Sequence, residues 1–129
     1  MRFCYPFVAM CLISAGCSTK STDPIAVEGT VTFMGRPLSG GIVVMTPDRA
    51  RGTNGKPIVG EIQSNGRYEL PSTGLVPGWY RVSISDSASW NAVEGFPASF
   101  RRPDRSGLSR ELLAGREHRF DYHIDATRP

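Results

Sequence analysis

Apolar and polar residues alternate with a period of two along most of this chain. The stretch 26–33 is a clear example, because Val27, Val31 and Phe33 fall on one face while charged and hydroxyl side chains fall on the other. Such alternation is typical of a half-buried β-strand, in which successive side chains point to opposite faces. We therefore expect a strand here, with Gly29 between the apolar positions.

Runs of the same kind recur along the chain, and residues typical of turns separate them. Residues 41–47 are apolar on both faces, which favours a central strand. The strands expected at 79–85 and 117–125 alternate again. Their expected inward positions are Tyr80, Val82, Ile84, His118, Phe120, Tyr122 and Ile124.

Two turns are expected to join neighbouring strands. Asn65 and Gly66 both tolerate the positive φ of a type I′ turn, so they predict a hairpin between residues 58–64 and 67–72. The last two expected strands are joined near Gly115.

The arrangement of these runs predicts an all-β fold. No part of the chain after the leader shows convincing helical periodicity. About seven short strands separated by turn residues argue for an antiparallel seven-stranded β-sandwich over residues 26–125. Residues 86–107 are then a long irregular segment, and residues 126–129 form a C-terminal tail.

The first residues have a different composition. A basic residue, Arg2, precedes an apolar run at 7–13, which is followed by small residues and then Cys17. This layout is that of a secretory signal peptide, and the run is shorter than the roughly 20 apolar residues that cross a bilayer. We expect residues 1–16 to be removed and residues 17–25 to form a flexible tether, because residues 18–24 are small and polar.

The sequence Ser-Ala-Gly-Cys at residues 14–17 resembles the lipobox of bacterial lipoproteins. The resemblance implies a diacylglyceryl group on the Cys17 thiol, an acylated amino terminus, and a membrane as the partner of that lipid. Ser14 stands where the family usually has leucine, although Leu12 and Ile13 lie close by. An ordinary secreted protein with a free cysteine near its terminus is the alternative.

The lipobox resemblance also bears on location. It implies an exported, membrane-anchored protein that faces the periplasm or the cell surface. An aspartate directly after the lipidated cysteine would resemble an inner-membrane retention signal. This chain has Ser18 at that position, and the lack of the aspartate favours the outer membrane.

Charge and cysteine content narrow the function further. The formal net charge is +3, and loss of Arg2 with the leader leaves 14 basic against 12 acidic side chains, or +2. A nucleic-acid partner would need clustered Lys and Arg, so none is expected. Of the three cysteines, Cys4 and Cys11 lie in the leader and Cys17 is the proposed anchor, so the expected domain has no thiol for catalysis or for zinc.

Three stretches, residues 27–47, 64–84 and 106–124, resemble the carboxypeptidase regulatory-like domain, which is a transthyretin-like sandwich. More narrowly, these stretches resemble the small bacterial lipoproteins built from one such domain. The matching positions are Val27, Gly29, Val31, Gly35 through Gly41, Gly66, Tyr68, Leu70, and Gly74 through Val82. The resemblance implies the fold, and it transfers no catalytic residue.

The chemistry-bearing residues do not form a recognisable catalytic or metal motif. His118 and His123 are separated by an odd offset, so on one regular strand they point to opposite faces and cannot share an ion. The serines lack the G-x-S-x-G elbow of a hydrolase nucleophile. We therefore expect no enzyme activity, no metal and no cofactor.

The long segment 86–107 is the candidate for binding. Its candidate contact residues are Trp90, Phe96, Phe100, Arg101 and Arg102. Aromatic and arginine side chains in a long loop can anchor a partner, such as an envelope protein or a polysaccharide. The favoured interpretation is instead that the aromatic side chains fold back as a plug over the open end of the sandwich.

Together these features predict a non-catalytic, membrane-anchored lipoprotein. Its β-sandwich would serve interaction or structure in the cell envelope. A carbohydrate- or peptide-binding module that uses residues 86–107 is the alternative.

Overall fold

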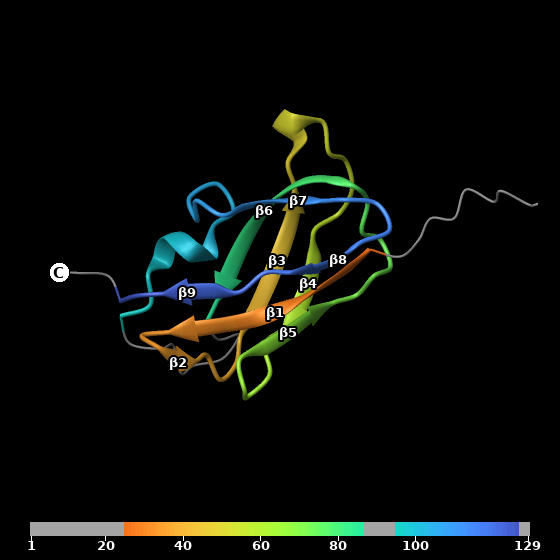
Figure 1. The fold of residues 1–129 in the computed structure, drawn as a ribbon. Helices are drawn as coiled ribbons and strands as arrows, with labels where there is room; N and C mark the ends of the chain where they lie inside the picture. Colours follow the sequence, from red (N-terminus) through yellow and green to blue (C-terminus); the bar gives the residue numbers. More distant parts are fainter. Residues whose placement is uncertain (1–24, 87–94, 127–129) are drawn as a thin grey trace, which may run out of the picture.

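The computed structural model describes residues 25–86 and 95–126. These residues form nine strands in two sheets and two short 3-10 helices, with no α-helix among them (Figure 1). The strands are β1 Ala26–Phe33, β2 Arg36–Pro37, β3 Ile42–Pro47, β4 Ile58–Glu61, β5 Arg67–Leu70, β6 Gly78–Ser85, β7 Ser109–Leu112, β8 Glu117–Arg119 and β9 Tyr122–Ile124, and the 3-10 helices are η1 Arg49–Arg51 and η2 Ala98–Arg101. The all-β prediction is confirmed for this part of the chain.

The larger sheet has five strands and is built around β1. Strand β5 pairs antiparallel with β1, with Val27 opposite Leu70, and the short β2 pairs with the end of β1. Strands β8 and β9 pair with β1 in parallel, with Val31 opposite Tyr122 in β9. Strand β1 is therefore the central strand of this sheet.

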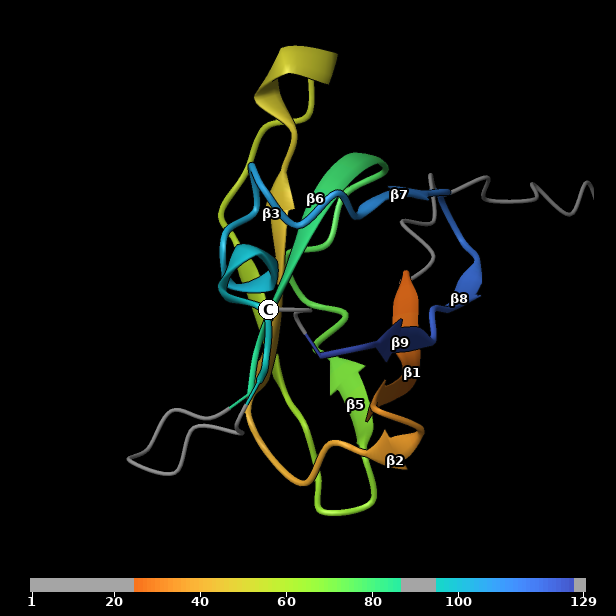
Figure 2. The same ribbon diagram turned by 90° about the vertical axis from the view of Figure 1, so that its left-hand side faces the viewer.

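The second sheet has four strands in the order β4-β3-β6-β7, and all its pairs are antiparallel. Strand β3 lies inside the sheet, as its apolar residues on both faces predict. Figure 2 shows the two sheets face to face, with β3 and β6 on one side and β1, β5 and β9 on the other. The arrangement is consistent with a β-sandwich.

The core lies between the inward faces of the two sheets. Its side chains come from the alternating positions, so the period-two prediction is confirmed. The core residues with the least exposed surface are Val31, Val43, Met45, Tyr68, Tyr80, Val82, Ile84 and Leu112. Because burial of apolar surface is the main driving force for folding, these residues determine how the sheets pack.

The predicted hairpin around Asn65-Gly66 is wrong in its pairing. A turn forms, with Gly66 at φ 82° and its N–H donating to the carbonyl of Gln63. Asn65 is not at positive φ, so this is not the type I′ turn that was predicted. Strand β4 pairs with β3 and β5 pairs with β1, and the two arms pair only next to the turn, at the bridge between Ile62 and Tyr68 and one further backbone hydrogen bond. Each arm has its own long-range partner, and the turn therefore carries the chain from one sheet to the other.

The prediction that the sandwich is antiparallel throughout is wrong for the last strand. Strand β7 pairs with β6, while β8 and β9 pair in parallel with β1. All seven predicted strands are found, but the last one is divided into β8 and β9, and β2 is added. The larger sheet is thus mixed rather than antiparallel.

Side chains explain why the last strand is divided. In a regular parallel ladder the N–H of Thr30 would donate to the carbonyl of Phe120. Instead that carbonyl accepts a hydrogen bond from the Tyr68 hydroxyl at 2.6 Å, and the Thr30 N–H donates to Asp121 Oδ1 at 2.9 Å. The carbonyl lies so close to Gly29 that a Cβ there would overlap it. A glycine is therefore required at position 29 of β1, where the Phe120 carbonyl approaches the strand.

Candidate functional site

The described half of the irregular segment, residues 95–107, packs against the core. Phe96 is 7% exposed, and its ring centroid lies 5.7 Å from that of Phe33 and 6.2 Å from that of Phe100. Phe100 is partly buried against the same cluster. The aromatic side chains thus fold back onto the sandwich, as the plug interpretation predicts for these residues.

An ion pair between an exposed arginine and a buried carboxylate joins this segment to the end of β6. Asp86 lies just after β6 with its side chain 1% exposed, and its Oδ1 accepts a hydrogen bond from Arg101 Nη2 at 2.7 Å. The Arg101 guanidinium carbon also lies 5.7 Å from the centroid of the Phe96 ring. A charge-assisted hydrogen bond to a buried carboxylate fixes the loop in place. The Ser106 hydroxyl adds a bond to the carbonyl of Val82.

The predicted contact residues are therefore not equivalent. Phe96, Phe100 and Arg101 form intramolecular contacts, although Arg101 is exposed, as Arg102 is. Trp90 lies outside the described residues, and so does the proposed lipid site Cys17. Ligand binding by this segment stays a prediction.

A second buried carboxylate, Asp48, holds the loop that follows β3. It accepts a hydrogen bond from the Ala50 N–H and forms an ion pair with Arg81 at 3.4 Å. Arg51 lies 3.7 Å from the same carboxylate, and its guanidinium carbon is 4.3 Å from the centroid of the Trp79 ring. Sequence reasoning missed this cluster, although an aspartate directly before a polar loop is a common capping residue.

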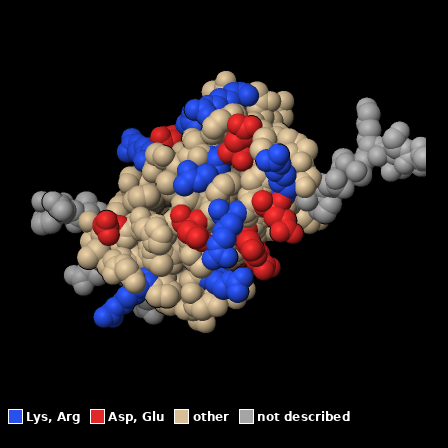
Figure 3. Space-filling model, in the orientation of Figure 1, with Lys and Arg blue, Asp and Glu red and all other residues tan. Residues whose placement is uncertain are grey.

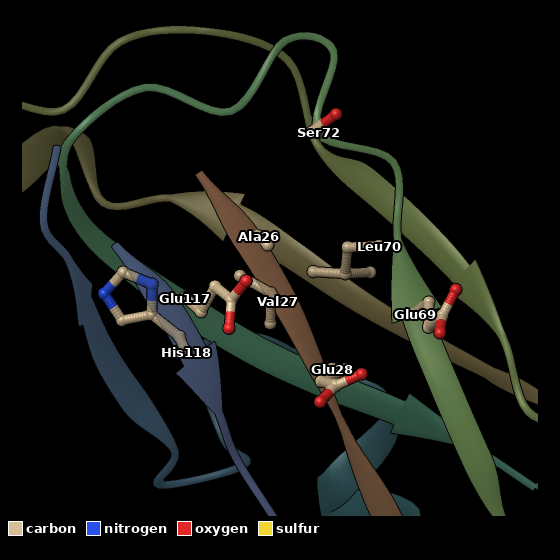
Figure 4. A pocket seen from close by; sticks show the side chains of 8 residues that line it. All are labelled: Ala26, Val27, Glu28, Glu69, Leu70, Ser72, Glu117 and His118. Carbon is tan, nitrogen blue, oxygen red and sulfur yellow. The ribbon is translucent and has the colours of Figure 1, made fainter. Parts of the chain in front are cut away.

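A hollow of about 290 Å³ lies where β1 begins (Figure 4). Its lining combines apolar and polar side chains, namely Ala26, Val27, Glu28, Glu69, Leu70, Ser72, Glu117 and His118. Glu28 and Glu69 face each other across the β1–β5 pair, and Glu28 lies 3.9 Å from Arg67. The hollow is open to solvent, and its carboxylates lie on the solvent-facing side of the sheet. We therefore regard it as a surface depression rather than an enclosed binding cavity.

The two histidines lie on opposite faces, as their odd offset predicts. His118 Nε2 accepts a hydrogen bond from the Leu113 N–H at 3.1 Å, which leaves Nδ1 as the protonated nitrogen of the neutral ring. His123 is exposed, with Nδ1 2.6 Å from the Thr32 hydroxyl. Within residues 25–86 and 95–126, no three His, Cys, Asp or Glu side chains are grouped so that they could hold a metal ion.

The outer face of the five-stranded sheet carries charges of both signs. Basic and acidic side chains are interspersed over it rather than segregated (Figure 3). Arg119 and Asp121 form one such pair at 3.4 Å. Exposed pairs of this kind contribute little to stability.

Comparison with known proteins identifies no relative: no family model matches the chain, and no curated protein matches it. In the part of the chain that the structure describes, no helix is long and apolar enough to cross a membrane.

Proposed function

We propose that this chain is a membrane-anchored lipoprotein whose β-sandwich serves a non-catalytic, structural or interaction role in the cell envelope. The proposal of a non-catalytic domain is supported by its buried polar groups, which bind other groups of the fold. Asp48 and Asp86 each bind an arginine that holds a loop, and the hydroxyls of Tyr68 and Tyr80 bind backbone groups. These groups stabilise the fold, and none of them is arranged as a nucleophile beside a base.

We further propose that the domain is of the carboxypeptidase regulatory-like, transthyretin-like type. Two glycines of the matching motifs support this assignment, because both lie where backbone segments approach closely. A Cβ at Gly29 would overlap the carbonyl of Phe120, and a Cβ at Gly41 would overlap the carbonyl of Ser85. Such positions explain why a motif of this kind would require glycine.

The anchor rests on the sequence around Cys17, and the start of the domain is compatible with it. Ile25 is 3% exposed and belongs to the core, so the folded unit begins directly after the polar residues 18–24. A lipid on Cys17 would therefore hold the sandwich close to the membrane. Several acyl chains make such attachment stable, since each buried methylene contributes about 0.8 kcal/mol.

Metabolic labelling with palmitate tests the anchor. The full chain is expected to incorporate the label, and Cys17→Ser is expected to abolish incorporation because the acceptor thiol is lost. Cys11→Ser is the matched control, because it removes a leader cysteine and leaves the acceptor. Absence of label from the natural chain, or label retained in Cys17→Ser, would contradict the proposal.

A further inference from the structure

Two uncharged loops surround the point at which the chain enters the domain. We call residues 71–77 and 113–115 the uncharged rim, because they contain no Asp, Glu, Lys or Arg. The N–H of Ala26, the first residue of β1, donates to the carbonyl of Arg116 directly after the rim, and Gly78 pairs with Leu112 beside it. Figure 1 shows the start of β1 and both loops at the same right-hand end of the molecule.

The rim presents apolar side chains to solvent. Val76 is 41% exposed and Leu113 is 40% exposed, and they are two of the four large exposed hydrophobic residues among those described. The β6–β7 pairing brings their two segments side by side. Single exposed apolar residues need no explanation. Two of them on adjacent segments, beside the place where the chain enters the domain, indicate a contact surface.

Both exposed residues are held by side chains from the interior. The Tyr80 hydroxyl donates to the carbonyl of Val76 at 2.8 Å and accepts from its N–H at 3.1 Å. The N–H of Leu113 donates to His118 Nε2 at 3.1 Å. Because the backbone at both positions is fixed, the apolar side chains are presented at little further cost in conformational entropy.

The length of the tether determines what lies opposite the rim. Only residues 18–24 separate Cys17 from Ile25, and a fully extended segment of this length spans at most about 30 Å. A membrane that holds Cys17 would thus always lie within that distance of Ile25, which precedes the first residue of β1 beside the rim. Such a short link gives a high effective concentration, so even a weak contact would be occupied.

We propose that the uncharged rim is a lipid-contact surface, with Val76 and Leu113 inserted at the boundary between headgroups and acyl chains. This inference rests on the proposed lipid anchor, which supplies the closeness. Amphipathic contact of this kind scales with the apolar area buried. The charges that flank the rim are Glu69, Glu111, Arg116 and Glu117. On a phosphatidylcholine surface, whose headgroups carry no net charge, the apolar contact should depend little on salt.

The contact can be measured without cellular lipidation. All strands and core residues of the described structure lie between Ile25 and Ile124, so the chain from residue 17 contains that folded unit. This chain would carry a hexahistidine tag in place of Cys17 and be bound to phosphatidylcholine vesicles through a nickel-chelating lipid. A single Leu113→Cys site would carry an environment-sensitive nitrobenzoxadiazole label.

We expect the emission of this label to rise severalfold and shift to shorter wavelength on vesicle attachment, with no change up to about 0.5 M salt. Val59→Cys is the control, because Val59 is 47% exposed on β4 of the other sheet; its label should respond little. Adding Val76→Ser to the Leu113→Cys chain should reduce the response. An unchanged Leu113→Cys label, or equal responses at both sites, would overturn the lipid-contact surface.

These outcomes are separate from those of the proposed function. The tag imposes the tether, so the vesicle result does not depend on acylation of Cys17. Failure of palmitate incorporation with a positive vesicle result would remove the anchor and leave the surface property. The reverse combination would leave the anchor and remove the inference.

Discussion

The two sheets of this protein use their hydrogen bonds differently. In the four-stranded sheet, β3 and β6 pair over six consecutive residues, and the inward residues Val43, Val82 and Ile84 are fully buried. In the five-stranded sheet, the parallel ladder between β1 and the last strand is interrupted, and the side chains of Tyr68 and Asp121 bind the freed backbone groups. The β3–β6 ladder is thus held by continuous backbone pairing, whereas the ladder between β1 and the last strand depends on side chains at its interruption.

This difference indicates where single substitutions act. A loss of apolar volume should be felt in either sheet, and the interrupted ladder adds a place where the loss of one hydroxyl or the addition of one methyl group disturbs the pairing of the last strand with β1. Burial of apolar side chains stabilises both sheets, because they share one core.

The largest effect is expected from Gly29→Ala. The added Cβ would overlap the carbonyl of Phe120, which is backbone and cannot move away without disturbing the Tyr68 bond. We expect a loss of at least about 3 kcal/mol in the free energy of unfolding, measured by urea denaturation. Gly40→Ala is the control: a Cβ there meets nothing within 4 Å, and its effect should be within about 0.5 kcal/mol. Similar stability of the two variants would contradict the close approach of the Phe120 carbonyl to Gly29.

Phe96→Ala should have the next largest effect, because Phe96 joins the two sheets. Its ring packs on Phe33 of the larger sheet, and the neighbouring Arg101 binds Asp86 at the end of β6. Truncation of a buried phenylalanine costs about 3 kcal/mol. Arg102→Ala in the same loop should change thermal stability little, because Arg102 is exposed. Equal effects of the two changes would contradict the plug.

Alkaline unfolding should report the buried tyrosines of the larger sheet. Burial raises the pKa of Tyr68 and of Tyr122, so both phenols stay protonated in the folded chain. The unfolded chain loses these protons as the pH rises through its phenol pKa of about 10. Stability is therefore complete below that pH and should fall above it by about 1.4 kcal/mol per pH unit for each phenol that stays protonated in the folded chain.

Tyr68→Phe separates this titration from other alkaline effects. The slope should fall by about half, while stability at pH 7 should fall by about 1 kcal/mol because the Phe120 carbonyl loses its partner. Denaturant titrations at several pH values would give both quantities. An unchanged slope would mean that ionisation of Tyr68 does not limit stability at high pH.

Asp121→Ala should have the smallest effect. Slight burial raises the pKa of Asp121, but hydrogen bonds from Thr30 and from Arg119 outweigh it and lower the pKa below its ordinary value. The carboxylate therefore contributes stability above its ordinary pKa and loses it as the pH falls. We expect a cost of less than about 1 kcal/mol at pH 7, because water can replace this exposed group. The difference from the natural chain should disappear in acid, and denaturant titrations at several pH values would measure it.

Local pattern was sufficient to predict the strands and their inward faces. Alternation in β1 and β6 and the apolar β3 all correspond to buried positions, because the period of a strand is set by its own backbone. The turn at Gly66 was predicted for the same reason, since the required φ is a local property.

Strand pairing was not predictable in this way. The alternation in residues 58–64 and 67–72 is compatible with pairing to each other or to distant strands. In the structure both segments pair with distant strands. Parallel pairing of β8 and β9 with β1 depends on contacts about 90 residues apart, which no local pattern encodes. The clusters around Asp48 and Asp86 were missed for the same reason, because Arg81 and Arg101 are remote in sequence.

The central claim is that a lipid on Cys17 holds this sandwich at a membrane. Mass spectrometry of the amino terminus of the full-length gene product, purified from cell membranes, tests it most directly. We predict a chain that begins at Cys17 and carries a diacylglyceryl thioether and an acylated amine. An unmodified Cys17, or a leader still attached to the membrane-derived protein, would contradict it.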